Sequence, residues 1–410
     1  MGKSERTEGS MRILIDALAV LPGINGGAAT YISGLANALA ESPAGHQFLV
    51  LGTAENRPLF ARDDAHFCFR TVRLPRGRLF RLLYEQSLLP LVAWRWKADV
   101  VFFPGNMNSL VLRYFHIPSL VTIHDASPDF YARHFPQYFP AWKGRVQRFL
   151  AREAARSASQ VLTNSEFARR EVAAYTGLPA ANILIVPPGC PHVPPSGAAL
   201  DTLARHYGFA TPYLFMLGGS NKHKNYDGAV TAFLRVKRKL GLPHHLLLAG
   251  LRGNGYDDLL KVIRDAGAES YVHLLGYVPS DHLATLYHGA DLFVMPSLYE
   301  GFGFPVLEAM GLGVPTLVAG SGSLPEVGGN APLYFDPHSV EAMADAMGVA
   351  LTNPGLRREL AAKGRERAAQ FSWQAMAVRI RECCEQCCGA RPEPALAVEG
   401  QTVARRASED

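Results

Sequence analysis

Two glutamates at a fixed spacing are the residues of this sequence most suited to binding a ligand. Glu300 and Glu308 follow an apolar run that ends at Met295, and the segment between them contains Gly-Phe-Gly-Phe-Pro. The apolar run is typical of a buried strand, and Pro305 favours the first turn of a helix. Backbone amides at such a helix start bind anions, because the positive end of the helix dipole lies there. The pattern predicts a diphosphate site, with one carboxylate on hydroxyls near a reacting sugar and the other on a ribose diol. In the alternative, Glu308 only favours the helix N-terminus and Glu300 is solvated.

A basic turn offers the positive charge that a diphosphate needs. Lys222 and Lys224 follow an apolar segment at residues 213–217 and a Gly-Gly pair. The segment is predicted to be a strand, and ligands of open α/β sheets bind beyond the carboxyl ends of the strands. The turn is therefore expected to face the same ligand, and an exposed basic turn is the alternative.

A histidine and an aspartate end another predicted strand, at residues 119–124. A histidine beside a carboxylate suits general-base chemistry, in which the carboxylate orients the ring. His124 and Asp125 are adjacent on an extended segment, however, and successive side chains there point to opposite sides. Asp125 is therefore not expected to orient His124, which is expected either to contact the ligand or to cap local structure.

Alternating strands and helices must position these residues. Residues 11–16 are predicted to be a strand, and a glycine-rich turn separates them from a predicted helix at 30–39, an order that opens a doubly wound domain. Further strands are predicted at residues 47–51, 99–103, 119–124, 160–164 and 183–186, with a helix at 140–158. The alternation then restarts, with strands at 213–217, 245–249, 272–275, 292–295, 316–319 and 332–335 and helices at 229–240 and 256–266.

This alternation predicts an α/β protein with two parallel sheets, and a length of 410 residues suits two Rossmann-like domains. The predicted parts are a disordered leader (1–10), a first domain (11–190), a linker rich in Pro, Gly and Ser (191–200), a second domain (201–371), a final helix (372–388) and a disordered tail (389–410).

The stretch from Glu300 to Glu308 resembles the E-x(7)-E signature of the family 4 retaining glycosyltransferases, which share the GT-B fold. In that fold, two Rossmann-like domains face each other across a cleft. Other segments between Arg12 and Trp373 match the family in chain order. They are Gly26-Gly27 with Tyr31, Thr122-Ile-His-Asp125, Thr163-Asn-Ser-Glu166, Pro188-Gly189, Gly276-Tyr-Val-Pro279, Ala290-Asp291, residues 309–315 and Leu324-Pro-Glu326.

The resemblance implies that the second domain binds a nucleotide sugar, that the first receives the acceptor, and that the final helix crosses back to the first domain. Glu300 would position the sugar, His124 would hold a sugar hydroxyl and Lys224 would stabilise the departing diphosphate, so these are the expected catalytic residues. The expected donor-binding residues are Gly26, Gly27, Gly219, Lys222, Lys224, Tyr277, Glu300, Gly301, Phe302, Gly303, Phe304 and Glu308, and the expected acceptor residues are Tyr31 and Asp125.

One position departs from the family pattern. Gly219 lies where many members have an arginine that binds the diphosphate together with the lysine matched by Lys224. Lys222 is expected to replace that charge, although an ammonium lacks the bidentate geometry of a guanidinium. Neither a metal nor a resident cofactor is expected, because no D-x-D follows a strand and the Asp257-Asp258 pair begins a predicted helix. Lysines and the Pro305 helix would supply the charge instead.

Whole segments look most like bacterial mannosyltransferases of O-antigen and exopolysaccharide assembly. This likeness implies GDP-mannose as the donor, with a UDP-sugar as the alternative, and a glycan or lipid-linked acceptor at the inner membrane face. Front-face attack is implied, since no residue is an obvious covalent nucleophile. A sugar-nucleotide epimerase would need further carboxylates, for which Asp125 and Asp129 are the candidates. A dehydrogenase is disfavoured because residues 23–27 lack G-x-G-x-x-G, and a non-catalytic relative is disfavoured because both glutamates and Lys224 are retained.

Basic residues interleaved with aromatic ones suit an anionic membrane surface, even though the formal net charge is only +5. One stretch carries Arg73, Arg76, Arg78, Arg81, Arg95 and Lys97 with Trp94 and Trp96. A second carries Arg133, Lys143, Arg145, Arg148, Arg152 and Arg156 with Phe135, Tyr138, Phe139 and Trp142. Solvated helix faces are the alternative, and nucleic acid is not expected because no recognition motif is present.

The sequence predicts a cytoplasmic protein with peripheral contact at the inner membrane face. Its first ten residues lack the apolar region of a signal peptide, and no apolar run reaches the length of a membrane span. Four of its six cysteines lie at residues 383–388, in the pattern Cys-Cys-Glu-Gln-Cys-Cys. These are expected to pack as small apolar residues of a helix, with zinc binding as the alternative.

Overall fold

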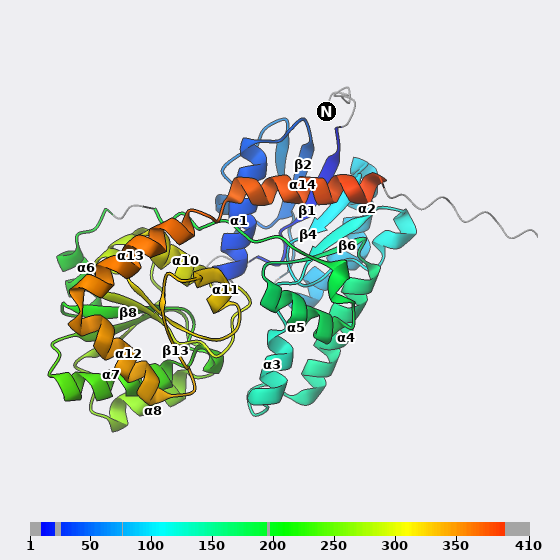
Figure 1. Cartoon of the computed structure of the whole chain (residues 1–410). Coiled ribbons are helices and arrows are strands. Elements are labelled where there is room, and N and C mark those ends of the chain that lie inside the picture. The colour runs from blue at the N-terminus through cyan, green and yellow to red at the C-terminus, as the bar shows by residue number, and fades with distance from the viewer. Residues whose placement is uncertain (1–9, 21–25, 76, 195–196, 390–410) are drawn as a thin grey trace, which may run out of the picture.

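The computed structural model describes residues 10–20, 26–75, 77–194 and 197–389, which form two parallel β-sheets with covering helices (Figure 1). The first sheet has the strand order β3-β2-β1-β4-β5-β6-β7, and the second has the order β10-β9-β8-β11-β12-β13. The order reverses beside β1 in one sheet and beside β8 in the other. Doubly wound folds bind ligands at this reversal, beyond the carboxyl ends of the strands.

The first domain contains the larger sheet. Its strands are β1 (Arg12–Asp16), β2 (Gln47–Gly52), β3 (Phe67–Thr71), β4 (Val100–Phe103), β5 (Ser119–Thr122), β6 (Gln160–Thr163) and β7 (Ile183–Ile185). Its helices are α1 (Gly26–Glu41), α2 (Arg78–Trp96), α3 (Ser127–His134), α4 (Ala141–Ser157) and α5 (Glu166–Thr176), with short 3-10 turns at Arg57–Leu59, Leu112–Phe115 and Ala180–Asn182. Every residue of β4 and β5 is buried, as expected for parallel strands covered on both faces.

The second domain repeats this plan. Its strands are β8 (Tyr213–Leu217), β9 (His245–Ala249), β10 (Val272–Gly276), β11 (Leu292–Met295), β12 (Thr316–Ala319) and β13 (Leu333–Phe335). Its helices are α6 (Leu200–Tyr207), α7 (Tyr226–Leu240), α8 (Tyr256–Asp265), α9 (Ser280–His288), α10 (Phe304–Gly311), α11 (Leu324–Gly328), α12 (Val340–Thr352) and α13 (Pro354–Ala368), and a 3-10 turn covers Lys222–Lys224. β11 and β12 are buried throughout.

The last helix, α14 (Trp373–Gly389), returns to the first domain and packs along α1 (Figure 1). A Cβ on Gly34 would collide with the ring of Trp373, so the two helices need a glycine at this contact. Cys383 and Cys384 are buried in the core, and the other two cysteines of the cluster pack against it. The predicted packing role of the cysteines is therefore confirmed.

The chain passes between the domains twice, and the two connections are hydrogen-bonded to each other. The backbone N–H of Cys190 donates to the carbonyl of Phe371 at 3.0 Å. The indole N–H of Trp373 donates to the carbonyl of Cys190 at 2.9 Å. A Cβ on Gly189 would collide with Trp373, so this glycine permits the contact. The two connections thus meet at one place.

The predicted elements are present with small shifts in their bounds. The strand predicted to reach His124 ends at Thr122, and the predicted linker is shorter because α6 begins at Leu200. Several elements were not predicted, among them β3, whose last two residues are exposed, α2, which contains Pro90, and the helices α3, α5, α6, α9, α11, α12 and α13. The predicted leader up to residue 9 and the predicted tail from residue 390 lie outside the described residues.

Candidate active site

The loop between β11 and α10 carries Glu300 and contacts the first domain. A Cβ on Gly301 would lie 2.7 Å from the carbonyl oxygen of His124, so the loop approaches that strand end closely because it has no side chain there. The hydroxyl of Ser165 donates to the carbonyl of Gly301 at 3.0 Å. Gly303 has a φ of +106°, which glycine adopts without the strain that other residues would suffer. The two domains therefore meet at the signature loop.

Glu300 forms a buried ion pair with Lys224. The Lys224 ammonium lies 2.6 Å from Glu300 Oε1, and the side chains are 14% and 12% exposed. Burial by itself would raise the pKa of the Glu300 carboxyl, but the charge of Lys224 and the hydrogen bond from its ammonium lower that pKa below its usual value. Two of the three expected catalytic residues are thus brought together, with Glu300 as a carboxylate.

Glu308 lies one turn into α10 and is held differently. The hydroxyl of Tyr287 donates to Glu308 Oε2 at 2.9 Å. Burial raises the pKa of the Glu308 carboxyl, and the hydrogen bond from Tyr287 offsets only part of that effect. Glu308 also lines a cavity of about 590 Å³ between the domains, together with Ser280, Leu283 and Trp373. A ligand in this cavity can reach the carboxylate.

The first turns of α1 and α10 are close to each other. A Cβ on Gly27 would lie 3.7 Å from the ring of Phe304, which is the first residue of α10. Pro305 occupies the second position of α10, as its sequence position predicted. The rings of Phe302 and Phe304 are buried, so these two residues can offer a ligand chiefly their backbone groups. The first amides of a helix have no partner within the helix, so this contact between two helix N-termini is a place where an anion can bind.

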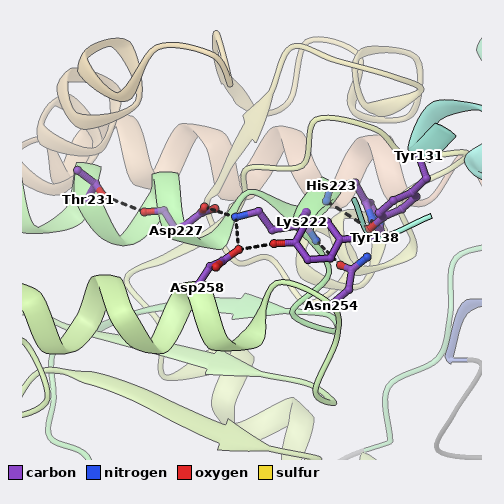
Figure 2. A network of polar contacts seen from close by, with 8 residues as sticks. All are labelled: Tyr131, Tyr138, Lys222, His223, Asp227, Thr231, Asn254 and Asp258. Atoms are coloured by element: carbon purple, nitrogen blue, oxygen red, sulfur yellow. Dashed lines mark hydrogen bonds and ion pairs between the residues drawn. The ribbon is translucent and has the colours of Figure 1, made fainter. Parts of the chain in front are cut away.

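Lys222 points toward two other carboxylates (Figure 2). Its ammonium lies 2.7 Å from Asp227 of α7 and 3.2 Å from Asp258 of α8. The hydroxyl of Tyr138, from the first domain, donates to Asp258 at 2.6 Å. The charge of Lys222 is therefore balanced within this network. The sequence predicted that Lys222 replaces a missing arginine at the diphosphate, and these contacts do not favour that role.

His223 lies between the two lysines and reaches the first domain. Its Nδ1 is hydrogen-bonded to the hydroxyl of Tyr131 at 2.7 Å (Figure 2). Burial, and then the charge of Lys224, lower the pKa of His223 to about 4, so its ring is neutral near pH 7. Tyr131 belongs to α3, and the basic turn is therefore held from across the domain boundary.

His124 is oriented by backbone rather than by Asp125. Its Nε2–H donates to the carbonyl of Pro104 at 2.7 Å, and its backbone N–H donates to Asn106 Oδ1 at 2.8 Å. Asp125 instead accepts the backbone N–H of Ser127 at 2.8 Å, at the start of α3. The prediction that Asp125 does not orient His124 is confirmed by these contacts.

Tyr31 lies behind His124. The two rings meet edge to face at 4.6 Å, the tyrosine hydroxyl is hydrogen-bonded to Thr122 at 3.1 Å, and only 1% of Tyr31 is exposed. Tyr31 therefore supports the His124 ring from the core, and the structure does not place it on an open surface where the predicted acceptor contact could form.

A second cavity, of about 280 Å³, opens at the ends of β8, β9 and β10. Tyr277 and Gly218 line it, the latter beside the predicted donor residue Gly219. Arg252 and Tyr256 also line this cavity, although sequence reasoning passed over them. Their position in the sequence could have indicated them, because residues 250–256 follow a buried strand just as the basic turn follows residues 213–217.

Further contacts across the domain boundary were also missed. The Glu326 carboxylate of α11 accepts the backbone N–H groups of Glu166 and Phe167 at 2.7 and 3.2 Å, at the start of α5. The hydroxyl of Tyr299 accepts the backbone N–H of Ala126 at 2.9 Å. Partners this far apart in sequence leave no local pattern, although Glu326 belongs to a matched motif.

The described part of the chain contains no cluster of three His, Cys, Asp or Glu side chains arranged to hold a metal ion. Within the same residues, no helix combines the length and apolar character needed to cross a membrane. The site described above can thus offer an anionic ligand a lysine, two helix N-termini and two carboxylates for hydroxyl groups.

Two parallel-sheet domains with this site between them define a GT-B glycosyltransferase, and comparisons with known proteins agree. Residues 26–189 match a family model described as "Glycosyl transferase 4-like domain", and residues 209–367 match one described as "Glycosyl transferases group 1". The chain is 33% identical over 318 residues to the O-antigen chain mannosyltransferase B of Escherichia coli, which covers 73% of this chain and 80% of the relative.

Solved structures share the fold. Sucrose-phosphate synthase from Thermosynechococcus elongatus aligns with a TM-score of 0.71 at 20% identity, over 93% of this chain and 100% of the other. The Anabaena protein HepE, in complex with UDP and glucose, aligns with a TM-score of 0.70 at 19% identity, over 91% and 99%. The chain therefore belongs to the family 4 glycosyltransferases of the GT-B fold, and it is a glycosyltransferase with mannosyltransferase relatives.

Proposed function

We propose that this enzyme transfers mannose from GDP-mannose, with retention of anomeric configuration, to a glycan or lipid-linked acceptor in cell-surface polysaccharide synthesis. The buried ion pair of Lys224 with Glu300, beside the N-terminus of α10, is the observation that carries the proposal. The name of the E. coli relative supports the sugar and the type of acceptor. The nucleotide sugar is a substrate, and no resident cofactor is proposed.

Lys224 and the N-terminus of α10 would stabilise the departing diphosphate. Charge develops on the diphosphate as the bond from the sugar C1 to the phosphate oxygen breaks, and donors fixed in advance stabilise that charge most effectively. Glu300 would lose part of its pairing with Lys224 and accept sugar hydroxyls instead. Glu308 would accept the ribose hydroxyls, since its pairing with Tyr287 leaves acceptor capacity free.

Retention would follow from attack on the same face of the sugar. The acceptor oxygen forms its bond to C1 as the diphosphate leaves, and the acceptor proton passes to a diphosphate oxygen. Glu300 is already bound to Lys224 in the described site, so it is better suited to positioning than to covalent attack. His124 has one ring nitrogen committed to Pro104, which suits it to holding a hydroxyl at fixed geometry.

The epimerase alternative loses support from the two aspartates that it requires. Asp129 pairs with both Arg133 and Arg148. Asp125 is hydrogen-bonded at the start of α3. The Asp129 carboxylate is therefore engaged by two arginines, and Asp125 Oδ1 by a backbone N–H, so the transferase assignment accounts for more of the site.

We also propose that the first domain contacts an anionic membrane through the outer sides of α2 and α4. Both helices pack on the same hydrophobic cluster of the first sheet through Leu89, Ala93 and Ala155. Their outer sides expose Leu79, Phe80, Leu83, Leu88, Leu91, Trp94, Trp142, Val146 and Phe149. Exposed basic residues lie among these, including Lys143, Arg145 and Arg152. Aromatic rings among cations fit an interface of lipid headgroups.

Nucleotide-dependent thermal stabilisation tests the donor assignment. Purified protein without added metal is compared in GDP, UDP, GDP-mannose and UDP-glucose, and hydrolysis of each sugar nucleotide is followed in the absence of acceptor. A ligand at a hundredfold excess over its dissociation constant adds about 2.7 kcal/mol to the folded state. Selective stabilisation by GDP and GDP-mannose supports the proposal. Selective stabilisation by UDP would move the assignment to a UDP-sugar transferase, and no effect from any nucleotide would contradict a donor site.

A further inference from the structure

The lysines of the basic turn do not provide a net positive charge. Lys222 is paired with Asp227 and Asp258, and Lys224 is paired with Glu300. His223 is neutral near pH 7 because its pKa is lowered to about 4. A donor diphosphate carries several negative charges, and a further cation close to Lys224 would help Lys224 and the N-terminus of α10 to balance them. The position that lacks a side chain, Gly219, cannot supply one.

Arg252 is a cation that lies at the same cavity as the turn of Gly218 and Gly219. It follows β9 and lines the 280 Å³ cavity together with Gly218 and Tyr277. Lys224 Nζ lies 3.6 Å from the position that a Cβ on Gly218 would take, so the Lys224 ammonium is close to the wall of the same cavity. The guanidinium of Arg252 lies 4.0 Å from the ring centroid of Tyr256, which orients it by a cation–π contact.

The loop that carries Arg252 is fixed to the turn that contains Gly219. The backbone N–H of Ser220 donates to the carbonyl of Leu251 at 3.0 Å, and the backbone N–H of Gly253 donates to Ser220 Oγ at 2.9 Å. A Cβ on Gly219 would lie 3.4 Å from that same Leu251 carbonyl. Residue 252 is therefore held next to the turn that contains Gly219.

We propose that Arg252 binds the diphosphate of the nucleotide donor and supplies the positive charge that the basic turn lacks. This inference rests on the proposed function. A guanidinium can donate two parallel hydrogen bonds to phosphate oxygens, which a lysine cannot do. Tyr256 limits the orientations of the free guanidinium, so less freedom is lost when the donor binds.

The test compares dissociation constants for GDP, GMP and guanosine in wild type, Arg252→Ala and Arg252→Lys, with UDP, UMP and uridine in parallel. Arg264→Ala is the matched control, because Arg264 is an exposed arginine on the same helix as Tyr256. Arg252→Ala is expected to weaken the diphosphate about tenfold and the free nucleoside hardly at all. Arg252→Lys is expected to lie between it and wild type, and the control is expected to bind as wild type does.

The outcomes separate this inference from the function on which it rests. If wild type binds a nucleoside diphosphate and Arg252→Ala binds it equally well, the role of Arg252 is wrong and the donor site stands. If Arg252→Ala weakens nucleoside and diphosphate by the same factor, the residue contacts the base or ribose, and the diphosphate assignment is overturned. If wild type binds none of the six compounds, the donor site fails and Arg252 fails with it. Unliganded melting temperatures confirm that each variant is folded.

Discussion

The ammonium of Lys224 lies 2.6 Å from Glu300 Oε1, and the two residues come from loops that follow different strands, β8 and β11. Each side chain is largely buried, so each charge is tolerated because the other is present. The pair joins two strand ends at the point where the order of the second sheet reverses. A donor that binds there must therefore compete with the ion pair, because Lys224 and Glu300 already bind each other.

Lys224→Met is expected to destabilise the protein by about 3 kcal/mol, because it leaves the Glu300 carboxylate buried without a partner. Urea unfolding measures this loss. The double variant Lys224→Met with Glu300→Gln is expected to recover most of the stability while donor hydrolysis stays abolished. Equal stability of the double and single variants would show that the ion pair does not account for the loss.

Glu300→Gln and Glu308→Gln are expected to shift stability in opposite directions at pH 7.5. The folded-state pKa of Glu300 is lowered, so its ionised form adds stability above the ordinary carboxyl pKa, and that stability is lost as pH falls through the lowered value. The folded-state pKa of Glu308 is raised, so its ionisation costs stability as pH rises through the raised value. Glu300→Gln should lower the melting temperature, Glu308→Gln should raise it, and the latter should weaken nucleotide binding. A lower melting temperature for Glu308→Gln would contradict this prediction.

His223 is expected to make the protein less stable as pH falls from about 6.5 to about 4. Its folded-state pKa is lowered to about 4, so the unfolded chain binds the extra proton in that range. The full effect of a shift of this size is about 3 kcal/mol. His223→Gln is expected to flatten the pH dependence of unfolding in the same range. An unchanged profile in this variant would assign the acid sensitivity to other groups.

Tyr131→Phe is expected to lower turnover several-fold with little change in nucleotide affinity. The variant loses the hydroxyl that joins α3 to His223, so the basic turn is held less firmly when the domains meet. Tyr207→Phe is the matched control, because it removes a Tyr–His hydrogen bond of 2.9 Å to His282 that lies wholly within the second domain. Donor hydrolysis kinetics measure the effect, and equal losses in both variants would contradict a role that depends on the domain contact.

Flotation with liposomes tests the membrane surface of α2 and α4. Wild type is expected to bind vesicles that contain an anionic lipid and to bind neutral vesicles weakly, with release at high salt. The double variant Trp142→Ala with Phe149→Ala removes two exposed rings and is expected to reduce binding while the fold is kept. Val378→Ala is the control, because Val378 is an exposed apolar residue of α14, away from α2 and α4. If the double variant binds anionic vesicles as well as Val378→Ala and wild type do, this surface is not the membrane contact.

Much of the fold could be predicted because parallel strands covered on both faces read as short apolar runs. Residues 292–295 and 316–319 were predicted from that pattern and are buried throughout. β3 was missed because its exposed residues break the pattern, and α2 was missed because Pro90 and many polar residues weaken the helical signal. The loop glycines and Pro305 were informative because their backbone preferences are local.

The contacts within the site were less predictable, since they depend on pairs far apart in sequence. From the sequence, Lys222 and Lys224 were both expected to bind the diphosphate. Asp227 and Asp258 approach Lys222 only because α7 and α8 pack side by side, which the sequence does not reveal. The packing of Tyr31 behind His124 likewise depends on the position of α1 relative to β5. Sequence motifs identify which residues matter more readily than they identify which way each side chain points.

The hydrogen-bonded meeting of the two interdomain connections has a mechanical consequence. The two interdomain connections are hydrogen-bonded to each other at Cys190 and Phe371 and would act as a pivot. Neither connection can lengthen, and the hydrogen bonds between them resist sliding. Relative motion of the domains is then close to a rotation about this pivot, and displacement grows with distance from it. Contacts remote from the pivot would open first and farthest, while the indole of Trp373 stays nearly in place. A ligand of the site between the domains would then enter and leave through one rotation of the domains.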